Sequence, residues 1–347
     1  MSINTAGIHI RGVGAVTAAG WSGADLLRAT REGVPLPVTS CARPEDERPW
    51  PCSVRLVPPP PPEKAARHPR LRRASAITRY SVAAALEALA DAGYDPAAPP
   101  KGLGILFVMM NGCVNYTGRF YQEVLLNPAQ ASPLIFPETV FNAPASHIAS
   151  FLGIDGAVST VVGSPNCITE ALHMASLWMR TGVVEECLLI AAEECDWLSA
   201  EALTYYHPKL VATEGAGALL LSTKAAGPQV RQVVGPLCYT SWEERAPLLS
   251  ELAARASAQL SADAAPVLVD DCCGIARIDR AETAAWSGGG RNWGAVRSPK
   301  AVLGESMGAG AALQLVLGIL EARDTRQPVV VSMPGANTAA YACVIGP

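Results

Sequence analysis

Apolar segments of strand length alternate with segments of helical pattern along the whole chain, and the same order occurs twice. The first series predicts strands at residues 8–13, 103–110, 157–162, 187–192 and 216–222, and helices at 79–92, 117–126, 144–152 and 166–180. After residue 224 the chain predicts strands at 233–239 and 266–270, helices at 242–260 and 308–322, a helix near Arg280, and last strands near Val329 and Ala342. This alternation predicts α/β layers. The repeated order indicates internal duplication, so we expect two related halves, 1–223 and 224–347, that share one core.

Composition excludes several classes of protein. Of the 347 residues, 50% are hydrophobic and 17% charged, which is too apolar for a disordered chain. The net charge of −4 gives no indication of a nucleic-acid partner. The longest apolar stretch, residues 308–320, is too short to span a membrane. Ten scattered cysteines without a CxxC pair and no signal-peptide pattern predict reduced thiols in the cytoplasm.

Two local features of the first 62 residues have general explanations. The stretch G-V-G-A-V-T after the first strand loosely matches a dinucleotide-binding turn, but it lacks the complete GxGxxG and the later acidic residue. Residues 34–62 are rich in proline and end in five consecutive prolines. Because proline fits neither helix interiors nor central strands, we expect an extended surface segment there.

Several segments, in order, resemble the β-ketoacyl synthases of the thiolase-fold superfamily. They are IRGVGAVTAAG at the start, RRASAITRYSVAAALEALADAGYD, FPETVFNAPASHIASFLGIDGAVSTVVG, TEGAGALLLST, SPKAVLGESMGAGAALQLVLGIL and PGANTAAYACVIG. The resemblance spans nearly the whole chain, although the C-terminal half is shorter than usual. It implies the thiolase fold, five layers α-β-α-β-α in two pseudo-symmetric halves, with dimerisation through the first half and no cofactor or metal.

The same resemblance implies a cysteine nucleophile at a helix N-terminus, where backbone N–H groups favour the thiolate, together with two histidines. Matching the apolar positions of the helix at 166–180 places Pro165 at the nucleophile position, and we expect it in the first helical turn, where proline is accepted. Cys167 lies two residues further on. It is a fallback nucleophile only if the helix register shifts by two.

The two histidine positions have also changed. The segment DDCCGIARIDRAE, anchored by Asp279 and Glu282, places Asp271 at the first. In the stretch that begins at Lys300, Glu305 follows Gly304 where the second is expected. A carboxylate donates no hydrogen bond to an enolate unless it stays protonated. Without its nucleophile, the chain has no covalent route, and condensation by this chain alone is not expected.

A synthase scaffold without its catalytic residues resembles a chain-length factor, the inactive partner of a ketosynthase in type II polyketide synthesis. The segments NGC and FNAPASHIA are similar to factors of aryl-polyene or highly reducing systems. The resemblance implies a heterodimer with an active ketosynthase, a tunnel for a polyene-type chain, and an acyl carrier protein as second partner. Aromatic-pathway factors usually carry Gln at the nucleophile position, so Pro165 departs from them and argues against decarboxylation.

Two further groups of residues are candidates for partner contacts. By the resemblance, residues after the strand at 103–110 line the partner's tunnel or pack in the interface; the candidates are Met109, Met110, Cys113, Tyr116, Phe120 and Phe136. Residues 64–79 hold six basic side chains and no acidic one. Arg70, Arg72 and Arg73 are therefore candidates for docking an acidic carrier protein, and a solvated helix entry is the alternative.

Other interpretations stay open. A divergent condensing or acyl-transfer enzyme would use Cys167 with Asp271 or Glu305, and a third possibility is a protein that holds an acyl group without reaction. The pair Cys272–Cys273 has no further ligand at zinc-binding spacing, so no metal site is expected. Glu193 and Glu194, at the end of a strand, are interpreted as structural.

Overall fold

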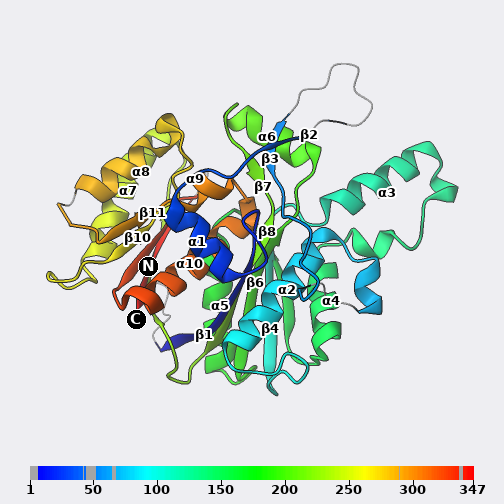
Figure 1. Ribbon diagram of the computed structural model, residues 1–347, viewed down its shortest axis with the longest axis horizontal. Helices are drawn as coiled ribbons and strands as arrows, with labels where there is room; N and C mark the ends of the chain where they lie inside the picture. The colour runs from blue at the N-terminus through cyan, green and yellow to red at the C-terminus, as the bar shows by residue number, and fades with distance from the viewer. Residues whose placement is uncertain (1–6, 42, 44–51, 65–67, 289, 336–338) are drawn as a thin grey trace.

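The computed structural model describes residues 7–41, 43, 52–64, 68–288, 290–335 and 339–347. Residues 8–222 supply the strands β1 (Ile8–Val16), β4 (Leu103–Met109), β5 (Val158–Val162), β6 (Glu186–Glu193) and β8 (Gly215–Ser222). The later residues supply β9 (Gln229–Cys238), β10 (Val267–Val269), β11 (Ala295–Arg297), β12 (Val329–Met333) and β13 (Ala339–Gly346). In the described residues these form one sheet in the order β11-β10-β12-β13-β9-β1-β8-β6-β4-β5 (Figure 1).

The two groups of strands meet edge to edge. Strand β1 pairs with β9 through Ile8 opposite Val230 and His9 opposite Gln229, whereas β1 and β8 pair along almost their whole length. Each group has its own crossovers, as a duplicated α/β chain requires. The expected division of the chain near residue 223 falls between β8 and β9 and stays a prediction.

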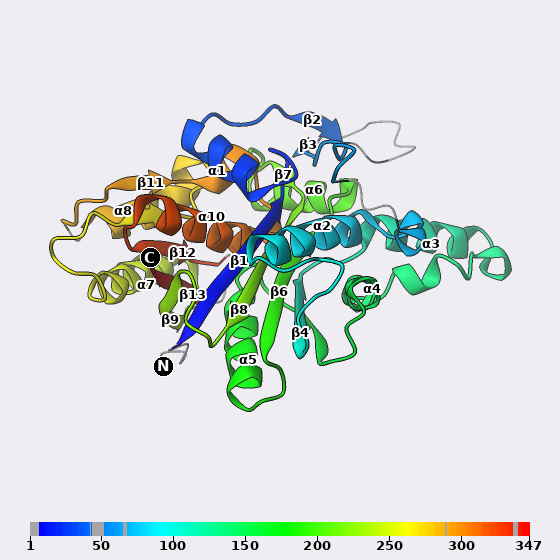
Figure 2. The ribbon, with the colours of Figure 1, turned by 60° about the horizontal axis from the view of Figure 1, so that its bottom comes forward.

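Helices cover both faces of each group of strands. The first half carries α1 (Gly23–Glu32), α2 (Ala76–Asp91), α3 (Val114–Leu126), α4 (Ala143–Leu152), α5 (Ile168–Arg180) and α6 (Trp197–Tyr206). The second half carries α7 (Trp242–Ser257), α8 (Ala276–Gly288), α9 (Pro299–Leu303) and α10 (Gly310–Thr325). Figure 2 shows α2 and α5 on opposite sides of the first group of strands.

The buried helix α10 joins the two halves. It is apolar on nearly every side, as is typical of a helix that is surrounded by protein. It contacts β1 and β8 of the first half and β10, β12 and β13 of the second. One core cluster contains side chains of α5, α10 and both groups of strands, and α7 and α8 pack on the outer face of the second group. The predicted five-layered α-β-α-β-α arrangement is therefore confirmed.

The glycines of the first strand serve helix packing. A Cβ atom on Gly12 would lie 2.0 Å from the carbonyl oxygen of Ala88, and one on Gly14 would lie 2.1 Å from that of Ala84. Both carbonyls belong to α2, whose alanines allow its backbone to approach β1 closely. The G-V-G spacing therefore reflects helix–strand contact and leaves no room for a dinucleotide at these two glycines.

Some elements were not expected from the sequence. The Pro-rich segment contributes β2 (Thr39–Cys41) and β3 (Cys52–Arg55), which form a three-stranded sheet with β7 (Ala212–Thr213). The five prolines that follow are in no helix or strand, as expected. Helix α6, absent from the prediction, packs on β3 and β7. None of the helices that the structure describes is both long and apolar enough to cross a membrane.

Candidate functional site

The three positions of the altered triad lie around one cavity of about 600 Å³. Pro165 reaches it from the turn before α5, Asp271 from the segment after β10, and Glu305 from the segment after α9. Helix α5 begins at Ile168, so Pro165 precedes the helix and does not occupy its first turn as expected. Segments more than a hundred residues apart thus supply one site.

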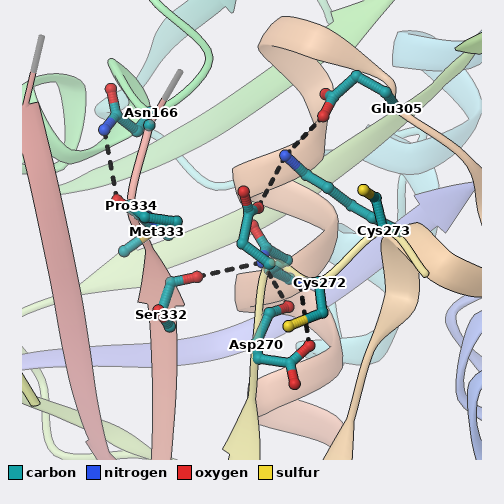
Figure 3. A network of polar contacts seen from close by, with 12 residues as sticks. Asn166, Asp270, Cys272, Cys273, Glu305, Ser332, Met333 and Pro334 are labelled. Atoms are coloured by element: carbon teal, nitrogen blue, oxygen red, sulfur yellow. Dashed lines mark hydrogen bonds and ion pairs between the residues drawn. The ribbon is translucent and has the colours of Figure 1, made fainter. Parts of the chain in front are cut away.

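Lys300 lies between the two carboxylates that replace the expected histidines. Its Nζ is 2.7 Å from Asp271 Oδ1 and 2.8 Å from Glu305 Oε2 (Figure 3). Burial lowers the pKa of Lys300, but the charges of Asp271 and Glu305 outweigh burial, and the net direction is upward. Burial raises the pKa of Asp271, against the opposing effect of Lys300. Lys300 is therefore a protonated clamp between two acids.

Backbone contacts hold both acids in place. The N–H of Asp271 donates to Glu282 Oε1 at 3.0 Å, and Glu282 also accepts from the Ser332 hydroxyl at 2.5 Å. Glu305 Oε1 accepts from the N–H of Met307 at 2.7 Å, and the Glu305 N–H donates to the Val211 carbonyl at 2.8 Å. Backbone and side-chain contacts thus hold the two acids in place, and none of the residues that line the cavity in the described part of the chain is a histidine.

Asn166 fills the space next to Pro165. Its Nδ2 donates to the carbonyl of Ala339 at 2.7 Å, and its Oδ1 accepts from the Ser164 hydroxyl at 2.9 Å. Figure 3 shows Asn166 beside Met333, the last residue of β12, and Pro334. This buried amide links the turn before α5 to the last two strands, and sequence reasoning gave it no role.

The thiols near the site are protonated. Cys167 is 6% exposed, belongs to the main core cluster, and is absent from the residues that line the cavity. Burial raises its pKa to about 12. Cys273 does line the cavity, but burial and the adjacent Asp279 raise its pKa to about 12 as well. Neither thiol has the lowered pKa of a nucleophile. Cys272 instead lies near Glu282 and Thr283.

Glu193 and Glu194 hold loops, in agreement with their structural interpretation. Glu193 accepts hydrogen bonds from the backbone N–H groups of Met110 and Asn111, directly after β4. Glu194 accepts from those of Ile77 at 3.0 Å and Asn115 at 2.9 Å, at the starts of α2 and α3. Two neighbouring carboxylates thereby fix the turn beside the cavity.

The predicted tunnel and interface residues separate into two groups. The side chains of Met109 and Cys113 are buried in a core cluster of the chain itself, and their part in the tunnel or the interface stays a prediction. Met110 is 39% exposed and lines the cavity. Phe120 and Phe136 contact each other with ring centroids 5.5 Å apart, and Phe136 is exposed; Tyr116 is half-buried.

The predicted docking arginines lie near the start of α2. Arg72 and Arg73 are exposed. The side chain of Arg70 lies outside the described residues. Their role in carrier-protein docking stays a prediction.

Comparisons with known proteins agree with this geometry. Residues 57–196 match the family model of the β-ketoacyl synthase N-terminal domain. A structure described as the ishigamide ketosynthase/chain length factor is 19% identical, with a TM-score of 0.78 over 98% of this chain and 99% of that one. The chain has the ketosynthase fold. The predicted resemblance to β-ketoacyl synthases is thereby confirmed.

Two further structures with this fold are similar over their full length. One is the type II polyketide synthase complex AntDE:AntF, with its acyl-carrier protein, at 14% identity, a TM-score of 0.78 and 98% coverage of both chains. The other is the ketosynthase ApeO in complex with its chain length factor ApeC from Xenorhabdus doucetiae. It is 14% identical, with a TM-score of 0.73 over 98% of this chain and 97% of that chain. No curated protein sequence matches this chain.

Sequence reasoning missed two contributors to the site. Helix α6 supplies Leu198, Ala202 and Leu203 to the cavity wall, and α7 supplies Arg245. A sequence signal for α6 does exist. Asp196 caps the helix by accepting from the Ser199 N–H at 2.8 Å, and the Ser199 side chain accepts from the Asp196 N–H in return.

Proposed function

We propose that this chain is a non-catalytic, chain-length-factor-type subunit that pairs with an active ketosynthase in type II polyketide synthesis. It shapes the tunnel for a polyene-type chain on an acyl carrier protein, in the cytoplasm. The observation that carries the proposal is the convergence of Pro165, Asp271 and Glu305 on one cavity, with Lys300 clamped between the acids. The similarity to structures that pair ketosynthases with chain length factors supports it.

The chemistry of the cavity argues against condensation. A condensing enzyme needs a thiolate that accepts the acyl group and donors that stabilise the enolate. Pro165 has no nucleophile, and a carboxylate, the group that Asp271 and Glu305 present to Lys300, only accepts hydrogen bonds. The ammonium of Lys300, the donor between them, is bound to both acids. The alternative that uses Cys167 is opposed by the burial and raised pKa of that thiol.

The surface of the first half supports a partner there. Strand β5 ends the sheet and pairs only with β4 among the described strands, so its other edge has free backbone groups. Val162 on this edge is 48% exposed. Helix α3, which follows β4 in the chain, and the segment after it expose Tyr121, Leu125, Leu126, Leu134 and Phe136. A free strand edge and a group of exposed apolar side chains are both typical of an interface.

Co-expression with a ketosynthase that carries the Cys-His-His triad tests the proposal. We expect a stable 1:1 complex that buries roughly 2,000 Å² or more. Val162→Asp adds a desolvated charge at the free edge and should weaken the complex at least tenfold. Val296→Asp is the matched control, because Val296 is also 48% exposed but lies on β11, at the opposite end of the sheet. Light scattering after size-exclusion chromatography measures both variants.

Two results would contradict the proposal. One is a soluble homodimer of this chain that condenses malonyl groups without a partner. The other is equal weakening of the complex by Val162→Asp and Val296→Asp, which would show that the β5 edge has no special part in assembly.

A further inference from the structure

Three cysteines lie close together around the small sheet of β2, β3 and β7, and none of them is among the residues that line the cavity. Cys41 is the last residue of β2, Cys52 is the first of β3, and Cys195 precedes α6. The side chain of Cys52 belongs to an apolar cluster, and those of Cys41 and Cys195 pack against it. Because ten residues separate Cys41 from Cys52, the pair has no CxxC spacing and the sequence pattern does not indicate it.

Cys41 and Cys52 face each other across two antiparallel strands. The register of β2 on β3 places Cys41 directly opposite Cys52. Directly opposite residues point to the same side of a sheet, and their Cα atoms are about 4.5 or 5.5 Å apart, depending on the backbone hydrogen bonds between them. A disulfide joins Cα atoms about 4.4–6.8 Å apart, so both separations suit one. In the strand pairs that the structure describes, no other cysteine lies opposite a cysteine.

Cys195 is placed less well as a partner for either of these thiols. It lies on no strand of the small sheet. Its Sγ contacts groups at the start of α6, the carbonyl oxygen of Asp196 at 3.6 Å and the hydroxyl oxygen of Ser199 at 3.9 Å. Cys41 is half-buried, so a small reagent reaches it, whereas Cys52 is only 4% exposed. Oxidation of the opposite pair should therefore begin at Cys41 and end at Cys52.

We propose that Cys41 and Cys52 form a reversible intrachain disulfide when a low-molecular-weight disulfide, such as glutathione disulfide, oxidises the chain. The Cys41 thiolate attacks one sulfur of the reagent, whose S–S bond breaks and releases one thiol, and a mixed disulfide forms. The Cys52 thiolate then attacks the Cys41 sulfur and releases the second thiol. The two cysteines together lose two electrons and two protons, and the reagent gains them. The inference concerns a site outside the cavity and does not depend on the proposed function.

The disulfide fastens an exposed strand to elements beside the cavity. In the described residues, β2 is at the end of the small sheet and exposes Thr39 and Ser40. Strand β3 pairs on its other side with β7 and contacts α6. The cross-link should therefore slow amide exchange in β2 at least tenfold. Strand β11, which also has three residues at the end of a sheet, is the matched reference and should not change.

Treatment of the full-length chain with glutathione disulfide, followed by mass spectrometry of the monomer, tests the inference. Cleavage after glutamate separates residues 33–45 from 48–63, and the disulfide holds these peptides together until it is reduced. Trypsin leaves both cysteines in residues 32–55, since proline follows both intervening arginines, and the disulfide there lowers the mass by two hydrogens. Burial raises the pKa of both thiols, so the rate of cross-linking should rise about tenfold between pH 7 and pH 8.

Serine variants identify the two partners. Cys41→Ser, at a half-buried position, should abolish the link between the two peptides and leave the fold intact. Cys195→Ser is the matched control, because it removes a thiol beside the same cluster and should leave the link unchanged. Four results would each overturn the inference: no cross-link in the unchanged chain, a glutathione adduct that stays on Cys41, a link from Cys41 to Cys195, or equal amide exchange of β2 in the reduced and oxidised chains. Complex formation with a ketosynthase is measured separately, so these failures leave the proposed function intact.

Discussion

At the scale of single residues, the two acids at the altered triad positions share one counterion, Lys300. Asp271 and Glu305 are mostly buried, and each has an oxygen within 2.8 Å of Lys300 Nζ. Two buried acids need a cation, and Lys300 supplies it here. The two carboxylates at the expected histidine positions therefore form, with Lys300, a local network that stabilises the fold.

Lys300→Met should be strongly destabilising, because it leaves two buried carboxylates without a counterion. Breaking a buried ion pair by removing one partner costs about 3–5 kcal/mol. Urea unfolding should show a loss of this size, and adding Asp271→Asn and Glu305→Gln should recover part of it. Lys101→Met, at an exposed position, should change the free energy of unfolding by less than about 0.5 kcal/mol. Equal effects of Lys300→Met and Lys101→Met would show that the ion pairs of Lys300 contribute nothing to the free energy of unfolding.

Cys167 should react slowly with iodoacetamide in the folded chain. A thiol with a pKa near 12 is ionised at pH 7.5 in fewer than about one molecule in ten thousand, and Cys167 is also buried. Cys238 is exposed and serves as the internal reference. Mass spectrometry of digested samples should show alkylation of Cys167 at least a hundredfold slower than that of Cys238. Rapid acylation or alkylation of Cys167 would instead favour the alternative of a divergent enzyme.

At the scale of elements, buried carboxylates tie the ends of strands and helices together. Glu87 on α2 accepts from the N–H groups of Ala15 on β1, at 2.9 Å, and Gly23 on α1, at 3.1 Å. Glu214 accepts from the Tyr80 hydroxyl at 2.6 Å and the Cys195 N–H at 3.1 Å. Glu193 does the same for the turn after β4, which carries Met110 to the cavity. These acids position the loops around the site.

Glu193 should make the stability of the fold depend on pH. Burial raises its pKa to about 7, although backbone hydrogen bonds oppose the shift. The folded state therefore binds the proton more tightly than the unfolded chain, in which the pKa is near 4.5. The resulting stabilisation is complete below about pH 4.5 and is lost as the pH rises through about 7, by at most about 3 kcal/mol.

Glu193→Gln provides the comparison, because glutamine resembles the protonated acid and does not titrate. Urea unfolding between pH 4.5 and pH 8 should show the unchanged chain losing stability relative to Glu193→Gln as the pH rises. A constant difference across this range would mean that the Glu193 pKa is not raised in the folded chain.

At the scale of the whole molecule, the sequence predicted the alternating elements and the layers. This was possible because the spacing of buried side chains within each helix or strand is visible in the local sequence. It did not predict α6, whose apolar Leu198, Tyr205 and Tyr206 are exposed, so no single buried stripe marks the helix. Nor did it identify Arg245, since an arginine in a first helical turn is usually solvated. Both belong to a cavity that forms only when segments distant in sequence come together. The residues next to them in the sequence do not indicate which distant segments those are.

Helix α3 exposes apolar side chains, and packing within the isolated chain does not account for this exposure. None of its 13 residues is buried, and Leu126 is 88% exposed. Figures 1 and 2 both show it projecting away from the rest of the molecule. A helix without tertiary burial is marginally stable in water, so its amide hydrogens should exchange rapidly in the isolated chain.

Pairing with the ketosynthase should bury this apolar surface and slow exchange in α3 at least tenfold. Hydrogen exchange followed by mass spectrometry compares the isolated chain with the complex, and α8, which packs against α7 in the second half, serves as the reference that should not change. If exchange in α3 stays fast in a complex that demonstrably forms, the partner covers another surface. Tyr116, Phe120 and Phe136 would then have to be removed from the predicted interface, because they lie on α3 or against it.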